Sequence, residues 1–347
     1  MLNYGIHRLA GLYQNKKRIY SFFIFDDCYT GYMKIFLIIT VIILMIIGMS
    51  YFFLKDKTEE FKNYQTYASN LQSYDTEKGV MKYYDEGEGQ VILLLHGTPT
   101  SSWMYRNVSS ELIDNGYRVI APDLMGFGAS DTLESFDDFD FENHAGYILG
   151  LMESLGVDSW EQATHDMGGI ISWHMVNQAA EKISHMHVLN TILYSETFAP
   201  PVNLNEESSF QKSILRLHEN KYIGKLIVNM MLSSGTKGYD FTTDIRAGYW
   251  LPLRDGAEGL VHFFTHTKEI SENIDTYRSW LIDSEIPTSI IWGKHDSFLD
   301  VKSVELLKEE MNIPENRILI LNDKKHLIAE EASMEVAQFI INKGKEI

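Results

Sequence analysis

The chain has 347 residues and a formal net charge of −18, with 48 acidic residues against 30 lysines and arginines. So acidic a surface repels phosphate groups, which excludes nucleic-acid binding and adhesion to an anionic lipid surface. Cys28 is the only cysteine, so the chain has no intramolecular disulfide and a hydrophobic core must supply its stability.

An apolar run occupies residues 35–54, twenty residues without a charge. A helix of that length spans about 30 Å, the thickness of a bilayer's hydrocarbon core. The run exceeds the core of a usual signal peptide and no Ala-x-Ala-like site follows it, which favours an uncleaved signal anchor. Residues 1–34 carry five basic and two acidic side chains, a net charge of +3. The positive-inside rule therefore predicts a single-pass membrane protein with a cytoplasmic N-terminus and the remaining chain on the other side. Met33 is an alternative start that keeps this orientation.

Residues 55–76 are rich in Lys, Glu, Tyr and Ser and are expected to form a tether. Beyond them, residues 91–95 are apolar and end at His96 and Gly97, the pattern of a buried parallel strand that runs into a loop. A second buried strand at 117–123 precedes a glycine-rich turn, a helical pattern over 142–155 and a further strand. This alternation predicts a doubly wound, mostly parallel α/β sheet.

Residues 162–169 read Gln-Ala-Thr-His-Asp-Met-Gly-Gly. A strand, a sharp turn with a reactive residue and a helix that starts at small residues form the nucleophile elbow of hydrolases. The reactive position here is Asp166, and Gly168 and Gly169 allow the helix to pack closely. A carboxylate is already anionic at neutral pH and needs no base to attack. The motif therefore favours displacement at a saturated carbon.

Three residues near this elbow are unusual. Thr164 stands where the elbow usually has glycine, and Glu161 and Gln162 interrupt a strand that should be buried. Buried polar groups without partners cost about 1–3 kcal/mol each. The sequence therefore predicts either partners for these side chains or a less stable sheet.

With these motifs the chain resembles the α/β-hydrolase fold family, in the aspartate-nucleophile branch that includes haloalkane dehalogenases and epoxide hydrolases. Residues 96–108, His-Gly-Thr-Pro-Thr-Ser-Ser-Trp-Met-Tyr-Arg-Asn-Val, look most like a haloalkane dehalogenase. Residues 188–191 look like the strand that precedes the cap in the same enzymes. The resemblance covers about residues 77–343. It implies a hydrolase core at 77–196 and 284–347 with an inserted helical cap at 197–283.

The resemblance also implies a catalytic triad. Asp296 follows a buried strand that ends near Gly293, and His326 follows a last strand at 317–321. In this interpretation Asp166 attacks the substrate to form an alkyl ester, and His326, oriented by Asp296, activates the water that hydrolyses it. Some relatives carry the acid after the strand that ends near Asn190, which leaves Glu196 as an alternative. The backbone N–H groups of Thr98 and Met167 are expected to stabilise the oxyanion.

The substrate is less well defined, because haloalkane dehalogenases cradle the halide with a tryptophan after the nucleophile and usually an Asn or Glu after His-Gly. This chain has Met167, whose thioether offers no donor, and Thr98, which offers one hydroxyl. The candidates for substrate binding are Trp103, Tyr249, Trp250 and Phe263, with Trp280 as a further possible donor. Epoxide hydrolases use cap tyrosines, and residues 261–266, where the family usually has one, contain none. Other tyrosines of the predicted cap could substitute, namely Tyr222, Tyr239, Tyr249 and Tyr277. Epoxide opening is therefore the second hypothesis, and a non-catalytic binding protein on the hydrolase fold is the third.

The remaining expectations concern cofactors and partners. The histidines are scattered without an evident metal-ligand spacing, and neither a phosphate-binding glycine loop nor a flavin motif is present. We expect no cofactor and no metal, a small apolar substrate and water as the reactants, and contact with a membrane through residues 35–54. The sequence leaves the oligomeric state and the substrate's identity open.

Overall fold

The structure, a computed structural model, describes residues 62–200, 221–254 and 258–344. The predicted segment 1–34, the signal anchor at 35–54 and the first part of the tether lie outside these ranges. Within them, no helix combines the length and the apolar character that crossing a bilayer requires.

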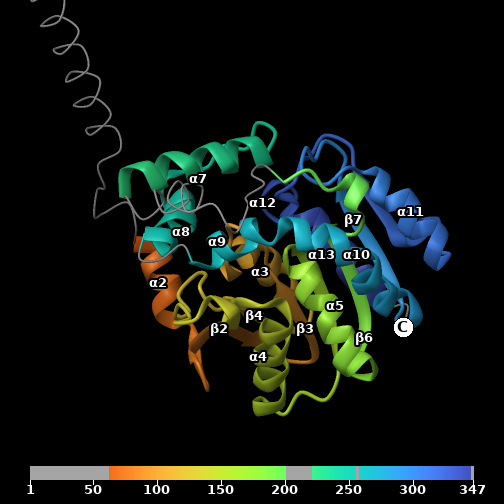
Figure 1. The fold of residues 1–347 in the computed structure, drawn as a ribbon, viewed down its shortest axis with the longest axis horizontal. Coiled ribbons are helices and arrows are strands. Elements are labelled where there is room, and N and C mark those ends of the chain that lie inside the picture. Colours follow the sequence, from red (N-terminus) through yellow and green to blue (C-terminus); the bar gives the residue numbers. More distant parts are fainter. Residues whose placement is uncertain (1–61, 201–220, 255–257, 345–347) are drawn as a thin grey trace, which may run out of the picture. The chain divides into compact units, whose positions relative to one another are not determined.

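An eight-stranded sheet in the order β1-β2-β4-β3-β5-β6-β7-β8 forms the centre of the described domain (Figure 1). The first two pairings, β1 with β2 and β2 with β4, are antiparallel, and all later ones are parallel. This topology confirms the predicted α/β-hydrolase sheet. The strands are β1 (Gln72–Thr76), β2 (Gly79–Gly87), β3 (Gln90–Leu95), β4 (Tyr117–Pro122), β5 (Trp160–Asp166), β6 (Ile183–Thr191), β7 (Thr288–Gly293) and β8 (Ile318–Leu321).

Helices cover both faces of the sheet, and the alternation of side chains along the strands explains how. In β3, Ile92 and Leu94 belong to one apolar cluster, and Leu93 and Leu95 belong to the other. The first cluster includes α3 (Arg106–Asp114), α12 (Ile328–Glu331) and α13 (Ser333–Gly344). The second includes α4 (Phe141–Ser154), α5 (Gly168–Ala179) and α11 (Lys302–Met311). Strands buried on both faces read as continuous apolar runs, as residues 91–95 do.

Glu161 and Gln162, the two polar residues that interrupt β5, have partners in the buried sheet. Gln162 accepts a hydrogen bond from the Trp160 indole at 2.9 Å and donates one to the Ser172 hydroxyl at 2.8 Å. Glu161 lies 3.0 Å from Nε2 of His187 on β6. Glu161 and Gln162 therefore have the partners that were one of the two predicted outcomes, whereas the Thr164 hydroxyl has no hydrogen-bond partner among the described residues.

Residues 62–76 correct the prediction of a tether. They form α2 (Lys62–Asn70) and β1, which pairs along its length with β2. Tyr64 is buried and its ring packs edge-on against Trp103, with ring centroids 5.5 Å apart. The prediction was wrong because it followed the polar composition of the segment. Two aromatic side chains on one face of this short helix, Tyr64 and Tyr67, pack against the core.

Four helices of the described residues lie between β6 and β7, in the stretch for which a cap is predicted. They are α7 (Lys221–Gly235), α8 (Thr243–Arg254), α9 (Glu258–Thr265) and α10 (Thr267–Asp283), and we call them the cap helices. α9 rests directly on the core, since a Cβ added at Gly259 would lie 2.5 Å from the Phe127 ring. α10 packs against α5 and returns the chain to the sheet (Figure 1).

Candidate active site

Asp166 is the last residue of β5, and its φ of 51° lies in the left-handed region. That conformation costs a non-glycine residue about 1–3 kcal/mol and is found where function requires a sharp turn. α5 begins at Gly168, where an added Cβ would lie 2.6 Å from the carbonyl oxygen of His96. Only glycine allows this close approach between the helix and the loop after β3. Residues 162–169 thus have the geometry of a nucleophile elbow.

Two backbone N–H groups point at the Asp166 carboxyl group. The N–H of Thr98 donates to Oδ1 at 2.8 Å, and the Thr98 hydroxyl lies 3.3 Å from the same oxygen. The N–H of Met167 also hydrogen-bonds to the carboxyl group. The side chain of Met167 is buried in the apolar core and takes no part in this arrangement. These are the two donors that the sequence predicts for an oxyanion.

His326 lies in the loop before α12 and connects two carboxyl groups. Its Nε2 is 3.6 Å from Oδ2 of Asp166, and its Nδ1 is 2.7 Å from Oδ2 of Asp296. The first distance is too long for a hydrogen bond, whereas the second is a strong one. Glu196, the alternative acid, has an exposed side chain. The geometry therefore favours Asp296 as the partner of His326.

Asn190 has a role that the sequence did not reveal. Its amide donates to Oδ2 of Asp296 at 2.7 Å, and its carbonyl oxygen accepts the N–H of Gly293 at 2.8 Å. The N–H groups of Phe298 and Leu299 donate to the other oxygen of Asp296, at 2.8 and 3.2 Å. Asp296 is thus held in one orientation by four donors including His326. The sequence signal that could have indicated this role is the position of a polar residue near the end of a buried strand.

The electrostatics of the three groups follow from their burial and their proximity. Burial raises the pKa of Asp166, while His326 and the N–H groups of Met167 and Thr98 oppose the shift. Burial also acts to raise the pKa of Asp296, but His326 and the other donors outweigh it and hold that pKa below its usual range. Burial acts to lower the pKa of His326, but Asp296 and Asp166 outweigh it and raise that pKa. An ionised Asp296 therefore holds a proton on Nδ1 of His326.

Two further histidines, His96 and His165, support the site, and neither supporting role was predicted from the sequence. His165 contacts the backbone carbonyl of His326 through Nε2 at 2.9 Å, which fixes the loop that carries the His326 ring. His96 accepts the N–H of Leu124 on Nε2 at 3.0 Å, so its Nδ1 donates to the Gly97 carbonyl at 2.9 Å. Burial lowers the pKa of His96 to about 4 and that of His165 to about 3, so both rings are neutral.

A cavity opens above Asp166 and His326, with about 530 Å³ of space between the atoms, part of it open to solvent. The cap helices contribute Phe263 and Phe264 from α9, and Met231 and Leu232 from α7, and most of the other walls are apolar as well. The full lining among the described residues is Thr98, Pro99, Thr100, Asp166, Phe198, Pro200, Met231, Leu232, Gly235, Phe263, Phe264, Phe298, His326 and Leu327. Such a lining suits a small apolar ligand.

Only Phe263 of the four residues predicted to bind substrate lines this cavity, and the other three predictions are corrected. Trp103 is buried beneath α8 and donates from its indole to a backbone carbonyl of that helix at 3.1 Å. Tyr249 donates to the carboxyl group of Glu330, and Trp250 is buried in the same apolar cluster. The sequence shows that Tyr249 and Trp250 are aromatic, but the direction of their rings depends on which face of α8 packs against the core.

The other aromatic candidates also lie away from the cavity. Tyr239 donates to Glu330 at 3.1 Å, and Tyr277 packs against Trp280 with ring centroids 5.3 Å apart. The side chain of Tyr222 lies outside the described part of the chain. In that part, neither a tyrosine nor a tryptophan lines the cavity.

Comparison with known proteins agrees with this fold. Residues 90–244 match the family of the alpha/beta hydrolase fold. A haloalkane dehalogenase of Mycolicibacterium paratuberculosis is 26% identical over 306 residues, which cover 83% of this chain and 97% of the relative. Epoxide hydrolase 3 of Xenopus tropicalis is 24% identical over 265 residues, which cover 74% of this chain and 71% of the relative.

Solved structures share the fold. The crystal structure of an ancestral haloalkane dehalogenase superposes with a TM-score of 0.64 at 18% identity, covering 80% of this chain and 99% of that one. These similarities support an α/β-fold hydrolase enzyme that is similar to haloalkane dehalogenases and epoxide hydrolases.

Proposed function

We propose that the protein hydrolyses a small apolar substrate through a covalent ester between the substrate's alkyl group and Asp166, with haloalkanes as the first substrate class. One observation carries the proposal. The Asp166 carboxyl group lies at a sharp turn in an apolar cavity, with Oδ1 on the N–H of Thr98 and Oδ2 facing Nε2 of His326. The similarity to haloalkane dehalogenases over most of both chains supports this substrate class.

In the first step, Oδ2 of Asp166 attacks the carbon that bears the leaving group. The carboxylate is the nucleophile in its ionised form, so no base is needed at this stage. A bond forms between Oδ2 and carbon, and the halide departs with the bonding electrons. Oδ1 becomes the carbonyl oxygen of the ester and keeps its hydrogen bond to Thr98.

In the second step, His326 takes a proton from water through Nε2, and the hydroxide attacks the carboxyl carbon of the ester. Negative charge develops on Oδ1, where the N–H groups of Thr98 and Met167 already point. Each such donor lowers the barrier by about 3 kcal/mol. Asp296 stabilises the imidazolium. As the intermediate collapses, the bond between the carboxyl carbon and the alkoxide oxygen breaks, and Nε2 of His326 returns its proton to that oxygen to give the alcohol. The Asp166 carboxyl group then loses a proton to solvent and is again a carboxylate.

The site offers few hydrogen-bond donors to stabilise a departing halide. Among the described residues that line the cavity, Thr98 provides a hydroxyl, and the indole that usually follows the nucleophile is replaced by a buried methionine. A chloride ion needs strong donors, whereas bromide and iodide are larger, less strongly solvated and leave from weaker bonds. We therefore expect bromoalkanes and iodoalkanes to react faster than the matching chloroalkanes.

Epoxide opening is the second candidate, because the chain is also similar to epoxide hydrolase 3 of Xenopus tropicalis. The same carboxylate would attack an epoxide carbon, and the ester would be hydrolysed in the same way. The proton for the opening ring would have to come from water or from a residue outside the described lining. Halide release identifies the first activity and diol formation the second.

We further propose that residues 35–54 anchor the protein in a membrane, with the N-terminus in the cytoplasm. Twenty uncharged residues and the net charge of +3 on residues 1–34 support this topology. Protease added to sealed inverted vesicles should then leave the hydrolase domain intact, and digestion of the domain would refute the orientation.

The decisive experiment is intact-mass analysis of the full-length His326→Ala variant after exposure to pooled haloalkanes and epoxides. Without the base that hydrolyses the ester, the enzyme should accumulate the substrate's alkyl group on Asp166, and the mass should identify the substrate class. His295 is exposed and serves as the matched control, since His295→Ala should turn over without an adduct. An adduct on another residue, or one that persists in the double variant with Asp166→Asn, would refute Asp166 as the nucleophile.

A further inference from the structure

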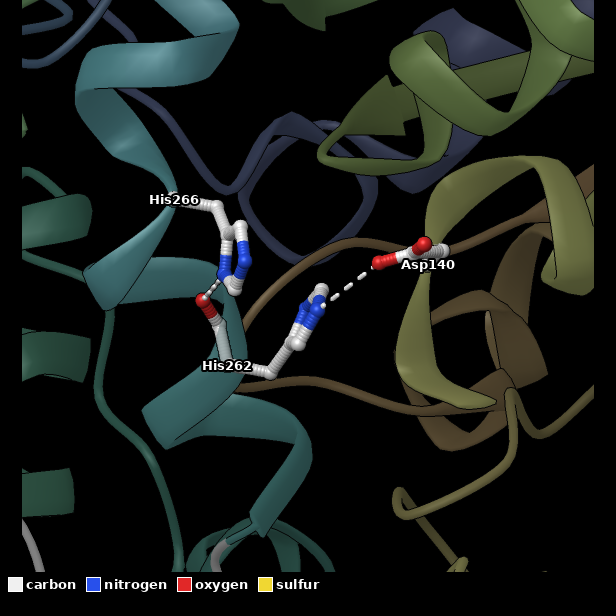
Figure 2. A group of neighbouring side chains, drawn as sticks. All are labelled: Asp140, His262 and His266. Atoms are coloured by element: carbon white, nitrogen blue, oxygen red, sulfur yellow. Dashed lines mark hydrogen bonds and ion pairs between the residues drawn. The ribbon is translucent and has the colours of Figure 1, made fainter. Parts of the chain in front are cut away.

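Three side chains meet at the junction between the core and the cap helices, away from the catalytic group. Asp140 immediately precedes α4, His262 lies in α9, and His266 lies at the boundary between α9 and α10. Figure 2 shows the two imidazole rings side by side, with the Asp140 carboxyl group facing His262. One ligand atom from each residue lies within 4.8 Å of the other two. Two imidazoles and a carboxylate are a common ligand set for transition metals.

The histidines occupy positions i and i+4, which brings both rings to the same side of the helix. His266 is oriented by a hydrogen bond from its Nδ1 to the His262 backbone carbonyl at 2.7 Å (Figure 2). That bond places the proton on Nδ1 and leaves the lone pair on Nε2, as in most metal-binding histidines. Nε2 of His262 is 3.3 Å from Oδ1 of Asp140. This spacing equals the separation of about 3.3 Å between two ligands of a tetrahedral zinc ion.

The surroundings leave access from solvent on one side. The side chain of His262 is 3% exposed, that of His266 13% and that of Asp140 59%. The carboxyl group of Glu269 lies 3.9 Å from Nε2 of His266, near enough to complete the coordination directly or through water. Phe139 and Phe141 flank the His262 ring, each with ring centroids 5.9 Å away, and limit its movement.

We propose that Asp140, His262 and His266 bind a divalent transition metal, with Zn²⁺ as the best-fitting ion, and that the metal fastens cap helix α9 to the core. Neutral imidazoles favour Zn²⁺ over Ca²⁺ and Mg²⁺, which prefer a full set of oxygen ligands. Binding needs small movements of the side chains, chiefly of His266, whose ring stacks on that of His262 with centroids 3.9 Å apart.

The site bears on the proposed reaction because of where α9 lies. His262 is directly followed by Phe263 and Phe264, which line the cavity above Asp166. A metal that joins α9 to Asp140 of the core holds these two aromatic side chains in place over the substrate. The metal thus acts on the cap and takes no part in the chemistry at Asp166.

The test is zinc binding by the full-length chain, purified without an affinity tag and freed of metal with a chelator. Equilibrium dialysis against Zn²⁺ followed by elemental analysis should give one ion per chain at this site. Asp140→Asn and His266→Gln should each weaken binding about tenfold or more. Zn²⁺ should also slow amide hydrogen exchange in residues 258–265 of the parent and leave exchange in those two variants unchanged.

Matched controls separate this site from others. Glu272→Gln alters an exposed acid of α10, and His295→Gln alters an exposed histidine of the core, so both variants should bind Zn²⁺ like the parent. His326→Ala removes the histidine of the catalytic group and should also bind normally. Parent-like binding by Asp140→Asn and His266→Gln would overturn the proposal, as would loss of binding in His326→Ala alone. A parent that binds no Zn²⁺ would overturn it as well.

Discussion

Glu330 connects the catalytic loop, the core and the cap, and its replacement should destabilise the protein strongly. Its side chain is fully buried, four residues after His326. Arg106 donates to both of its oxygens, at 2.5 and 2.8 Å, and the hydroxyl groups of Tyr239 and Tyr249 donate to it as well. One carboxylate thus joins α12, α3 and α8.

The expected loss of stability follows from the Arg106 charge, which a substitution of Glu330 leaves without its partner. Glu330→Gln removes the negative charge and presents an N–H₂ group to donors that need an acceptor. The Arg106 side chain is 13% exposed, so its charge remains largely desolvated and unpaired. Loss of one partner from a buried ion pair costs about 3–5 kcal/mol. Because domains are stable by about 5–15 kcal/mol, the variant should fold with a much reduced midpoint.

The assay is urea unfolding of the full-length chain, followed by tryptophan fluorescence, with Glu335→Gln as the control. Glu335 is an exposed acid on the neighbouring helix α13, so its replacement should change the free energy of unfolding by less than about 0.5 kcal/mol. The double variant Arg106→Met/Glu330→Leu should recover part of the loss, because it removes both charges. A loss below about 1 kcal/mol in Glu330→Gln would refute the reasoning.

Three further predictions follow from buried groups. The Thr164 hydroxyl is buried and has no hydrogen-bond partner among the described residues, so Thr164→Val should raise the free energy of unfolding by about 1 kcal/mol; a fall measured by urea unfolding would contradict this. Burial raises the pKa of Glu161 to about 7, so stability that is present below pH 4 is lost as the pH rises through 7. Glu161→Gln should remove about 3 kcal/mol of that dependence between pH 4 and pH 8, and an unchanged curve would contradict it. Hydrolysis of the ester needs a neutral His326 ring, whose pKa is raised above its usual range, so kcat should rise with pH through that raised value. Asp296→Asn should move the limb of the pH–rate profile to lower pH as well as slow the reaction, and a limb that does not move would argue against Asp296 as the source of the shift.

The sequence was sufficient to predict the parts of the molecule that depend on local pattern. The apolar run before His96 and Gly97 marks a strand buried on both faces, and the residues around Asp166 mark a sharp turn before a helix. The chain order of Asp166, Asp296 and His326 then assigns each to the end of a parallel strand. Because these ends meet at one edge of the sheet, the three side chains lie together.

The contacts that depend on packing between distant elements could not be predicted in the same way. Nothing local to Tyr249 or Trp250 shows which face of α8 meets the core, and their aromatic character suited a pocket as well as it suits the core. An asparagine cannot serve as the triad acid, but the Asn190 amide on β6 orients Asp296, which follows β7. No metal-ligand spacing among the histidines was predicted from the sequence, although His262 and His266 are four residues apart, as two ligands on one helix can be. The third residue, Asp140, lies more than a hundred residues away. Only the fold brings that carboxyl group to the two rings.

Two of the polar contacts between the cap helices and the core lie close in sequence to a wall or a residue of the candidate active site. Through Tyr249, Glu330 fixes α8 to α12, the helix that follows His326. Through His262, Asp140 fixes α9, which carries Phe263 into the cavity. Weakening the first attachment should disturb the histidine that hydrolyses the ester and lower kcat. Weakening the second should loosen the apolar wall that holds the substrate and raise KM. We therefore expect the Glu330 contact to affect the chemical step and the Asp140 contact to affect substrate binding, although neither contact includes the substrate.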